Sequence, residues 1–147
     1  MFATGVTIVT ARNAAGEPVG LTANSFNSVS LEPPLVLWSL SRAAASMPAF
    51  ANGSHYAINV LAAGQKALAE RFAARGIDRF AGVEHQPGIS GAPLLAGALA
   101  TFECFNRSRY EEGDHVIFVG EVERCRHHAS LPPLLYHGGR FYTEHPL

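Results

Sequence analysis

The sequence predicts a mainly β domain, an antiparallel barrel or sandwich that carries a few short helices. Short runs of β-branched and aromatic residues outnumber the segments with helical periodicity. Turn-forming residues such as Asn, Gly and Pro separate these runs. No repeat, linker or low-complexity segment divides the 147 residues, so we expect a single domain over residues 1–147.

The first two expected strands form a hairpin near the N-terminus. The run from Phe2 to Ala11 is rich in β-branched residues whose side chains alternate between two faces. Asn13, Gly16 and Pro18 then supply the residues of a turn. The run from Val19 to Thr22 returns as the second strand, which completes the hairpin.

Further strands and two helices are expected along the rest of the chain. Apolar runs bounded by turn signals predict strands at Val36–Leu40, Tyr56–Leu61, Ala98–Phe105, Val116–Val122 and Arg140–Tyr142. The segment from Arg109 to Asp114 has the composition of a turn. Helices are expected from about Ala43 to Ala51 and from about Gln65 to Ala74, where Leu68 and Phe72 share one face.

Composition and charge exclude several classes of partner. With 11 basic and 12 acidic residues the formal net charge is −1, so neither nucleic acid nor an anionic membrane is expected as a partner. The longest apolar runs are too short to span a bilayer. No signal peptide is visible, and the two cysteines form no metal or disulfide motif, so we expect a cytoplasmic protein.

The segment from Gly20 to Ser30 is crowded with small hydroxyl and amide side chains. Short donors and exposed backbone N–H groups suit the edge of a flat ligand that carries carbonyls and ring nitrogens, such as an isoalloxazine. The same composition is typical of a Ser- and Asx-rich turn that closes a hairpin. Composition alone leaves both interpretations open.

A second candidate site lies where a strand ends and a helix is expected to begin, from Ser39 to Pro48. Ser41 or Ser46 can cap the helix, and Pro48 suits an early helical position. Free N–H groups at a helix N-terminus bind phosphate, and Arg42 would add positive charge. An ordinary capped helix with a solvated arginine explains the same residues.

His115 opens an apolar strand directly after the tight turn at Gly113 and Asp114. It can face a cleft and contact a nicotinamide, or it can be a strand-edge histidine with satisfied hydrogen bonds. Cys104 and Trp38 lie in apolar strands, and we expect both in the core rather than as nucleophile or stacking platform.

We expect no metal site. His127 and His128 are adjacent, so in a strand their rings point to opposite faces. His137 and His145 follow, but no carboxylate or cysteine stands at ligand spacing. The sequence also lacks a Gly-x-Gly-x-x-Gly fingerprint, a Walker loop and a Gly-x-Ser-x-Gly elbow, which excludes a Rossmann dinucleotide-binding domain.

Seven segments in order resemble the flavin reductase-like family, the small reductase components of two-component flavin monooxygenases. They are FATGVTIVTA, GLTANSFNSVSLEPPLVLWSL, SMPAF with YAINVL, ERFA with DRFAGV, GAPLLAGALATFEC, GDHVIFVGEV and PLLYHGGRFY. They cover nearly the whole chain. The resemblance implies an antiparallel, Greek-key split β-barrel, flavin reductase-like, and a homodimer with flavin near the interface.

The resemblance also implies the cofactors and their residues. FMN or FAD would be reduced by NADH or NADPH, and a partner oxygenase would receive the reduced flavin. His115 would contact the nicotinamide, which makes it the expected catalytic residue. The isoalloxazine, ribityl chain and phosphate would be held by Thr22, Ala23, Asn24, Ser25, Ser39, Leu40, Ser41, Arg42, Ser46, Arg79 and Phe80.

Two alternative functions fit the same kind of barrel. One is a flavin-binding protein without turnover, such as an electron carrier. The other is a pyridoxamine-phosphate-oxidase-like or haem-binding split barrel, which the TANSF and GDH segments disfavour. For the reductase, hydride passes between the two cofactors, so the protein needs only to align the rings and stabilise the reduced flavin. This explains why no acid–base pair stands out in the sequence.

Overall fold

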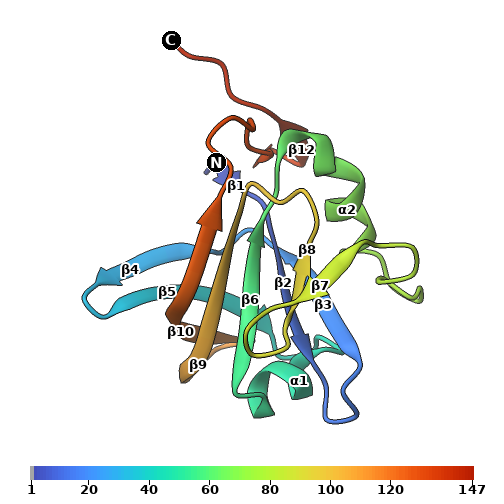
Figure 1. Ribbon diagram of the computed structural model, residues 1–147, viewed down its shortest axis with the longest axis vertical. Coiled ribbons are helices and arrows are strands. Elements are labelled where there is room, and N and C mark those ends of the chain that lie inside the picture. The colour runs from blue at the N-terminus through green and yellow to red at the C-terminus, as the bar shows by residue number, and fades with distance from the viewer. Residues whose placement is uncertain (1) are drawn as a thin grey trace.

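The computed structural model describes residues 2–147 and is mainly β (Figure 1). The two helices among these residues are short, and a 3-10 turn, Ala63–Gln65, leads into the second. The helices are α1, Met47–Asn52, and α2, Lys66–Arg71. The strands are β1 Thr4–Gly5, β2 Thr7–Arg12, β3 Pro18–Ala23, β4 Asn27–Leu31, β5 Pro34–Ser41, β6 His55–Val60, β7 His85–Pro87, β8 Pro93–Leu95, β9 Ala100–Glu112, β10 His115–His127, β11 Leu135–His137 and β12 Arg140–Tyr142.

Seven of the strands form one antiparallel sheet in the order β3-β2-β6-β9-β10-β5-β4. The sheet curls, because the end of β3 approaches β5: Ser25, just after β3, accepts a hydrogen bond at Oγ from the backbone N of Ser39, at 2.9 Å. This confirms the prediction of a mainly antiparallel β domain. Closure as a Greek-key split barrel remains a prediction.

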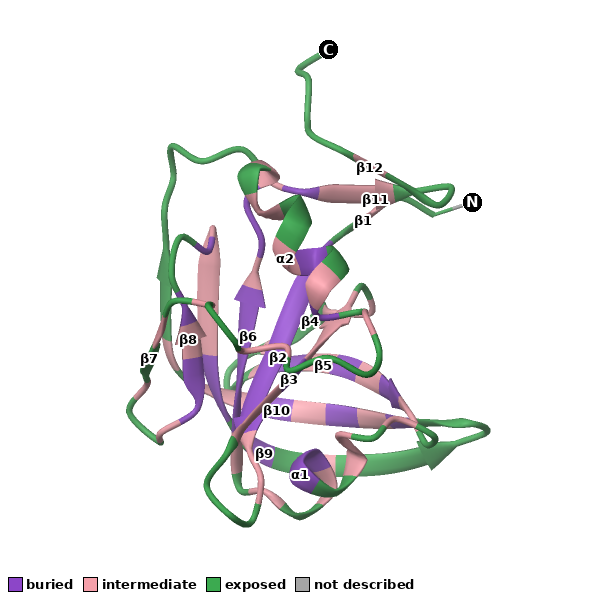
Figure 2. Cartoon of the chain, turned by 90° about the vertical axis from the view of Figure 1, so that its right-hand side faces the viewer, coloured by how far each residue is buried: buried purple, intermediate pink, exposed green. Residues whose placement is uncertain are grey.

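The main core lies inside the curl of this sheet (Figure 2). Alternation along β5 turns Val36, Trp38 and Leu40 inward, and all three are buried. The indole of Trp38 stacks on Phe118 with ring centroids 4.8 Å apart. Cys104 belongs to the same cluster, so the predictions that Trp38 and Cys104 are core residues are confirmed.

A second core cluster lies under α2 and joins it to the start of β2. Phe72, at the end of α2, is fully buried and lies across β3 at Gly20. A Cβ at Gly20 would come within 3.1 Å of the Phe72 ring, so this position favours glycine. This packing holds α2 beside β3, in which the hydroxyl-rich segment from Gly20 to Ser30 begins.

Two sequence predictions about elements are wrong. The helix expected over residues 43–51 begins only at Met47, because the chain from Arg42 to Ser46 forms turns, in which the backbone N of Ala44 donates to the Ser41 carbonyl. The turn expected from Arg109 to Asp114 is strand, with Glu112 paired to His115 and only Gly113 and Asp114 in the turn. Gly113 has a φ of 62°, which a two-residue hairpin turn requires.

Four short strands were not expected. β4 pairs with β5 at the edge of the main sheet, β7 pairs with β8, and β11 joins β1 to β12. β4 is short, and three of its five residues are polar, so apart from Val29 and Leu31 its sequence has the composition of a loop. The other strands predicted from the sequence are confirmed, with the N-terminal run divided into β1 and β2.

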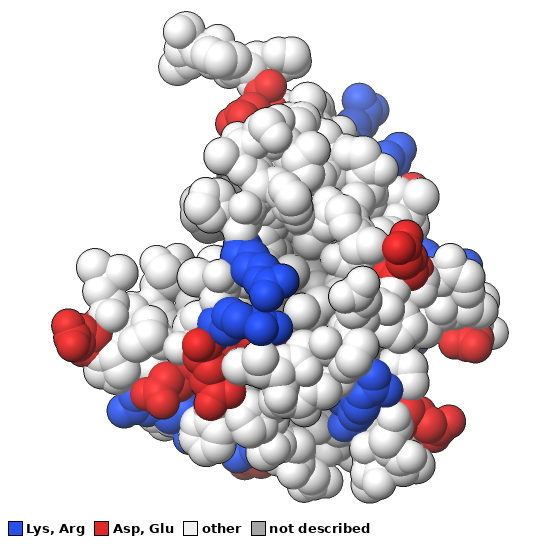
Figure 3. All heavy atoms as spheres, in the orientation of Figure 1, with Lys and Arg blue, Asp and Glu red and all other residues white. Residues whose placement is uncertain are grey.

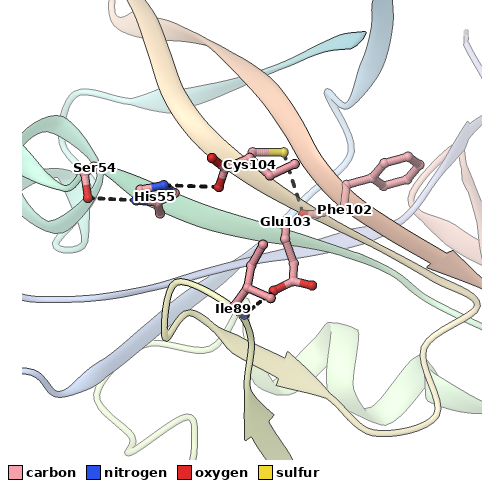
Figure 4. A network of polar contacts seen from close by, with 7 residues as sticks. Ser54, His55, Ile89, Phe102, Glu103 and Cys104 are labelled. Atoms are coloured by element: carbon pink, nitrogen blue, oxygen red, sulfur yellow. Dashed lines mark hydrogen bonds and ion pairs between the residues drawn. The ribbon is translucent and has the colours of Figure 1, made fainter.

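A buried carboxylate fastens the β7–β8 hairpin to the main sheet (Figure 4). Glu103 in β9 is 2% exposed and accepts a hydrogen bond at Oε1 from the backbone N of Ile89, at 2.7 Å. Its other oxygen pairs with Arg124 on β10. A side chain at Gly88 would collide with the Glu103 carboxylate, so glycine is needed where the hairpin comes this close.

Acidic and basic side chains are interspersed on the face shown in Figure 3, with wide uncharged areas between them. No helix within residues 2–147 is both long and apolar enough to cross a membrane.

Candidate functional site

Antiparallel pairing brings three of the expected site residues to one end of the β5–β10 ladder. Ser41, the last residue of β5, is the register partner of His115, the first residue of β10. The backbone N of Arg42 donates to the Asp114 carbonyl at 2.9 Å, which fixes the chain just beyond the ladder. Ser41 and Arg42 are therefore neighbours of His115 in space, although Ser41 and His115 are 74 residues apart in the sequence.

His115 is held by the residue before it. Its Nδ1 lies 2.7 Å from Oδ1 of Asp114, and about half of the imidazole side chain, 48%, is exposed. The hydrogen bond and the charge of His115 lower the pKa of Asp114, so the carboxylate is ionised and can only accept. Nδ1 therefore carries a proton, and Nε2 is left for a ligand.

Exposed polar groups surround this pair. Nη2 of Arg42 pairs with Oε1 of Glu111 at 2.8 Å, and both side chains are largely exposed. The Ser41 hydroxyl accepts a hydrogen bond from the backbone N of Ala43 at 3.3 Å. Ser46 occupies the N-cap position of α1, yet its hydroxyl makes no capping bond. The hydroxyl of Ser46 and the guanidinium of Arg42 are thus within this turn region and open to a polar ligand.

The hydroxyl-rich segment, Gly20 to Ser30, contacts β5 through the side chain of Ser25. Besides the bond from Ser39 N, the Ser25 hydroxyl lies 3.3 Å from the Ser39 carbonyl, so Ser25 closes β5 against the turn after β3. Leu40 faces the core and is 2% exposed, so only its backbone can meet a ligand. Ala23 is fixed in β3, where its carbonyl accepts from the Thr7 hydroxyl at 2.7 Å.

A cavity of about 530 Å³ opens on the other side of the hydroxyl-rich segment. Thr22 and Asn24 line it, but the Thr22 hydroxyl donates to the Ala69 carbonyl at 2.6 Å and so holds α2. The exposed Asn24 makes no side-chain hydrogen bond within the described residues. The remaining walls are Val6, Ala69, Glu70, Ala73, Ala74, Tyr136, Gly139 and Phe141.

Arg79 and Phe80 lie on the α2 side, away from the Ser41–His115 end, and contact the protein itself. Arg79 donates from Nη1 to the Gly20 carbonyl at 2.8 Å and from Nε to the Ala74 carbonyl at 3.0 Å. Burial, followed by the charge of Arg75, lowers the pKa of Arg79. Phe80 packs edge-on against Phe72 with ring centroids 5.0 Å apart. Both residues join the loop after α2 to β3 and the second core.

Sequence reasoning missed the C-terminal wall of the cavity, Tyr136, Gly139 and Phe141. These residues belong to the β11–β12 hairpin, which lies next to β1. The Gly138-Gly139 pair is a sequence signal for a two-residue hairpin turn, and both glycines have the positive φ, 59° and 80°, that such a turn requires. A Gly-Gly pair between aromatic residues predicts such a hairpin, although not its place beside the cavity.

This arrangement offers a mostly apolar cavity, a free amide at its rim and, past Ser25, a group of hydroxyls, one guanidinium and one imidazole. Such a layout can hold a flat ring with a polar, anionic extension. Within residues 2–147, no group of three or more His, Cys, Asp or Glu side chains is placed to hold a metal ion.

Comparison with known proteins identifies the class. Residues 1–145 match the flavin reductase like domain, and the chain therefore belongs to that family. It is 46% identical over 140 residues to the NADH-dependent FMN reductase SmoA of Agrobacterium fabrum, covering 95% of this chain and 79% of that protein. It is 37% identical to HsaB of Rhodococcus jostii, the reductase subunit of a flavin-dependent monooxygenase, covering 99% of this chain and 74% of that protein.

Solved structures agree with this membership. The chain superimposes with a TM-score of 0.93 on the NADH:FAD oxidoreductase SgcE6 of Streptomyces globisporus, solved in complex with NAD and FAD fragments. Identity is 44%, and the alignment covers 99% of this chain and 87% of that one. The chain spans 79% of SmoA but only 45% of a probable flavin reductase of Rhizobium meliloti, so some relatives are much longer.

Proposed function

We propose that the protein is an NAD(P)H-dependent flavin reductase that transfers hydride from a nicotinamide to FMN or FAD. The observation that carries this proposal is the match to the flavin reductase like domain over residues 1–145, together with a TM-score of 0.93 to a reductase crystallised with NAD and FAD fragments. The site supports it because the structure offers an apolar cavity, open hydroxyls, a guanidinium and an imidazole, which suit a flat ring, an oxyanion and a carboxamide.

The cavity beside Thr22 and Asn24 fits the flat ring system of a flavin. Its volume of about 530 Å³ lies within the range of small-molecule sites, and its walls are mostly apolar. The Asn24 amide can donate to a ring carbonyl and accept from a ring N–H. Thr22 and Ser25 would act indirectly, since their hydroxyls fix α2 and β5 at the two ends of the segment.

The ribityl chain and phosphate would be held beyond Ser25, where β5 ends. The open hydroxyl of Ser46 and the guanidinium of Arg42 can bind an oxyanion, and the outward-facing Ser39 and Ser41 can bind hydroxyls. Glu111 now neutralises Arg42 in an exposed ion pair. A bound phosphate would compete with Glu111 for this guanidinium, at little cost because exposed pairs contribute about 0–1 kcal/mol.

His115 would orient the nicotinamide. With Nδ1 donating to Asp114, the imidazole is held in one orientation and directs Nε2 outward. Nε2 can then hydrogen-bond the carboxamide of the nicotinamide and keep its ring over the flavin. When both cofactors are bound, they supply the hydride chemistry themselves, and the protein aligns them.

The assembly and location remain proposals as well. We infer a homodimer, because the edge strand β4 projects from the molecule (Figure 1) with Val29 and Leu31 exposed at 49% and 96%. We infer an oxygenase partner, because relatives such as HsaB are reductase subunits of monooxygenases. A cytoplasmic location suits the free cysteines, Cys104 and Cys125.

Rapid mixing tests this function directly. Protein equilibrated with FMN or FAD is mixed anaerobically with NADH, and the loss of oxidised-flavin absorbance is followed. A reductase reduces its flavin at a rate that saturates with nicotinamide concentration. Tight flavin binding with a reduction rate equal to that of free flavin would instead establish a flavin carrier without turnover.

A further inference from the structure

A second cavity, of about 330 Å³, lies between the β7–β8 hairpin and the far ends of β9 and β10. It shares no lining residue with the cavity beside Thr22 and Asn24, and it lies at the opposite end of β10 from His115. Its polar lining includes Glu84, His85, Thr101, Arg126, His127 and His128.

Register explains why Arg126 is available to a ligand. On β10, Arg124 pairs in the ladder with Glu103 of β9, and their side chains form an ion pair. Arg126 is two residues further along β10, so its side chain points to the same face as that of Arg124. Its register partner is Thr101, which is uncharged. Arg126 makes no hydrogen bond or ion pair with any residue in the described range 2–147, and its side chain lines the cavity.

Imidazoles add further hydrogen-bonding groups. Nδ1 of His85 lies 2.9 Å from the Val83 carbonyl, which can only accept, so Nδ1 is protonated and Nε2 remains free. His127 and His128 are exposed and make no side-chain hydrogen bond to the described part of the chain. Glu84 is the only carboxylate among the lining residues, against one guanidinium and three imidazoles.

The hairpin wall of this cavity is held firmly. Oδ1 of the buried Asn59 accepts from the backbone N of Leu95 at 2.9 Å, and Nε2 of Gln65 donates to the Ala96 carbonyl at 2.9 Å. Glu103 holds the hairpin tip through Ile89. The walls are therefore fixed before a ligand arrives, which lowers the entropic cost of binding.

We propose that this second cavity is an oxyanion site for phosphate or a phosphate monoester, separate from the flavin site. A guanidinium binds phosphate oxygens through two parallel N–H donors, and no residue in the described range 2–147 pairs with Arg126 and would compete. His128, two residues beyond Arg126, can donate, Nε2 of His85 can accept from a P–OH group, and the half-buried Leu94 can contact the organic part of an ester.

NMR of the histidine side chains tests the site at pH 7, with riboflavin in place of FMN, because FMN is itself a phosphate monoester and would compete for the proposed site. Inorganic phosphate is titrated at constant ionic strength against sodium chloride. We expect saturable shifts at His85 and His128, and Arg126→Gln should weaken binding by about tenfold, as loss of a charged hydrogen bond predicts. The matched variant Arg140→Gln removes the same charge elsewhere and should leave the affinity unchanged.

A parallel titration with AMP separates the two sources of phosphate. Tighter binding of AMP than of inorganic phosphate supports a monoester ligand, and equal binding supports free phosphate. Shifts that do not saturate, that chloride reproduces, or that Arg126→Gln and Arg140→Gln reduce equally would overturn the site. Neither result depends on whether the protein reduces flavin.

Discussion

The imidazole of His115 shows how a single exposed residue can be prepared for binding. The neighbouring Asp114 fixes its Nδ1 proton, and the turn at Gly113 sets both residues at the mouth of the β5–β10 ladder. No buried charge is required for this arrangement. This suits a reaction whose chemistry belongs to the cofactors, because orientation is then the main task of the protein.

His115→Ala should raise KM for NADH while the Kd for flavin stays near that of the wild type. The reason is that the imidazole lies at the start of β10 and not in the cavity lined by Thr22 and Asn24. Loss of one hydrogen bond predicts a change of about tenfold in kcat/KM. Steady-state kinetics and a fluorescence titration of flavin measure the two quantities.

The matched control is His145→Ala, which removes an exposed imidazole from the C-terminal tail. It should change neither KM nor Kd. Equal losses of nicotinamide and flavin affinity in His115→Ala would show that His115 is structural.

Ser46→Ala should weaken binding of FMN more than binding of riboflavin. The Ser46 hydroxyl makes no cap bond, so its removal should leave α1 intact and delete only a ligand contact. A charge-assisted hydrogen bond predicts a loss of about tenfold for FMN. Parallel titrations with the two flavins decide the point, and an equal effect on both would refute the phosphate role.

The two cysteines should differ in reactivity. Burial, with the charges of Glu123 and Glu103, raises the pKa of Cys104 to about 12, so this thiol stays protonated at pH 8. Cys125 is exposed. Alkylation of the native protein at pH 8 should modify Cys125 alone, and mass spectrometry after denaturation should find both modified. Rapid native modification of Cys104 would contradict its place in the core.

At the level of elements, Glu103 joins β9, β10 and the β7–β8 hairpin. Arg124→Ala would leave this buried carboxylate without its cation and should cost about 3–5 kcal/mol of unfolding free energy. The control Arg107→Ala breaks an exposed pair with Glu121 and should cost about 0–1 kcal/mol. Urea unfolding measures both, and equal costs would mean that the Glu103 carboxylate is solvated.

Elements with one buried face could be predicted from the sequence, and those without one could not. β5 alternates between Trp38 or Leu40 inside and Ser39 or Ser41 outside, which gave its position closely. The outer half of the β9–β10 hairpin is exposed and polar, so Arg109 to Glu112 has the composition of a turn although it is strand. Pairing with a neighbouring strand, and not side-chain pattern, defines such segments.

The candidate site, too, could be predicted only in part from the sequence. Local composition indicated the segments on β3 and β5, the resemblance assigned their residues, and Ser41 and His115 do meet in the structure. The cavity itself depends on α2 and the β11–β12 hairpin, which lie far from the hydroxyl-rich segment in sequence. Arg79 and Phe80 were assigned by resemblance, and their contacts here are with Gly20 and Phe72.

For the whole molecule, the proposed dimer makes β4 the surface to test. Leu31 is 96% exposed on this edge strand, and burial of a leucine contributes about 1.5–3 kcal/mol. Leu31→Glu should therefore weaken dimerisation by about tenfold or more, as measured by light scattering across a dilution series. Leu147→Glu, in the exposed C-terminal tail, is the control. An unchanged dimer in Leu31→Glu would place the interface elsewhere.

Steady-state oxidation of NADH and NADPH by the purified protein, with and without FMN or FAD, tests the central claim most directly. A flavin reductase oxidises nicotinamide only when flavin is present, and its rate saturates with both. This measurement also identifies the preferred nicotinamide and the preferred flavin. Saturable flavin binding without nicotinamide oxidation, in a protein shown to be dimeric, would contradict the proposed activity.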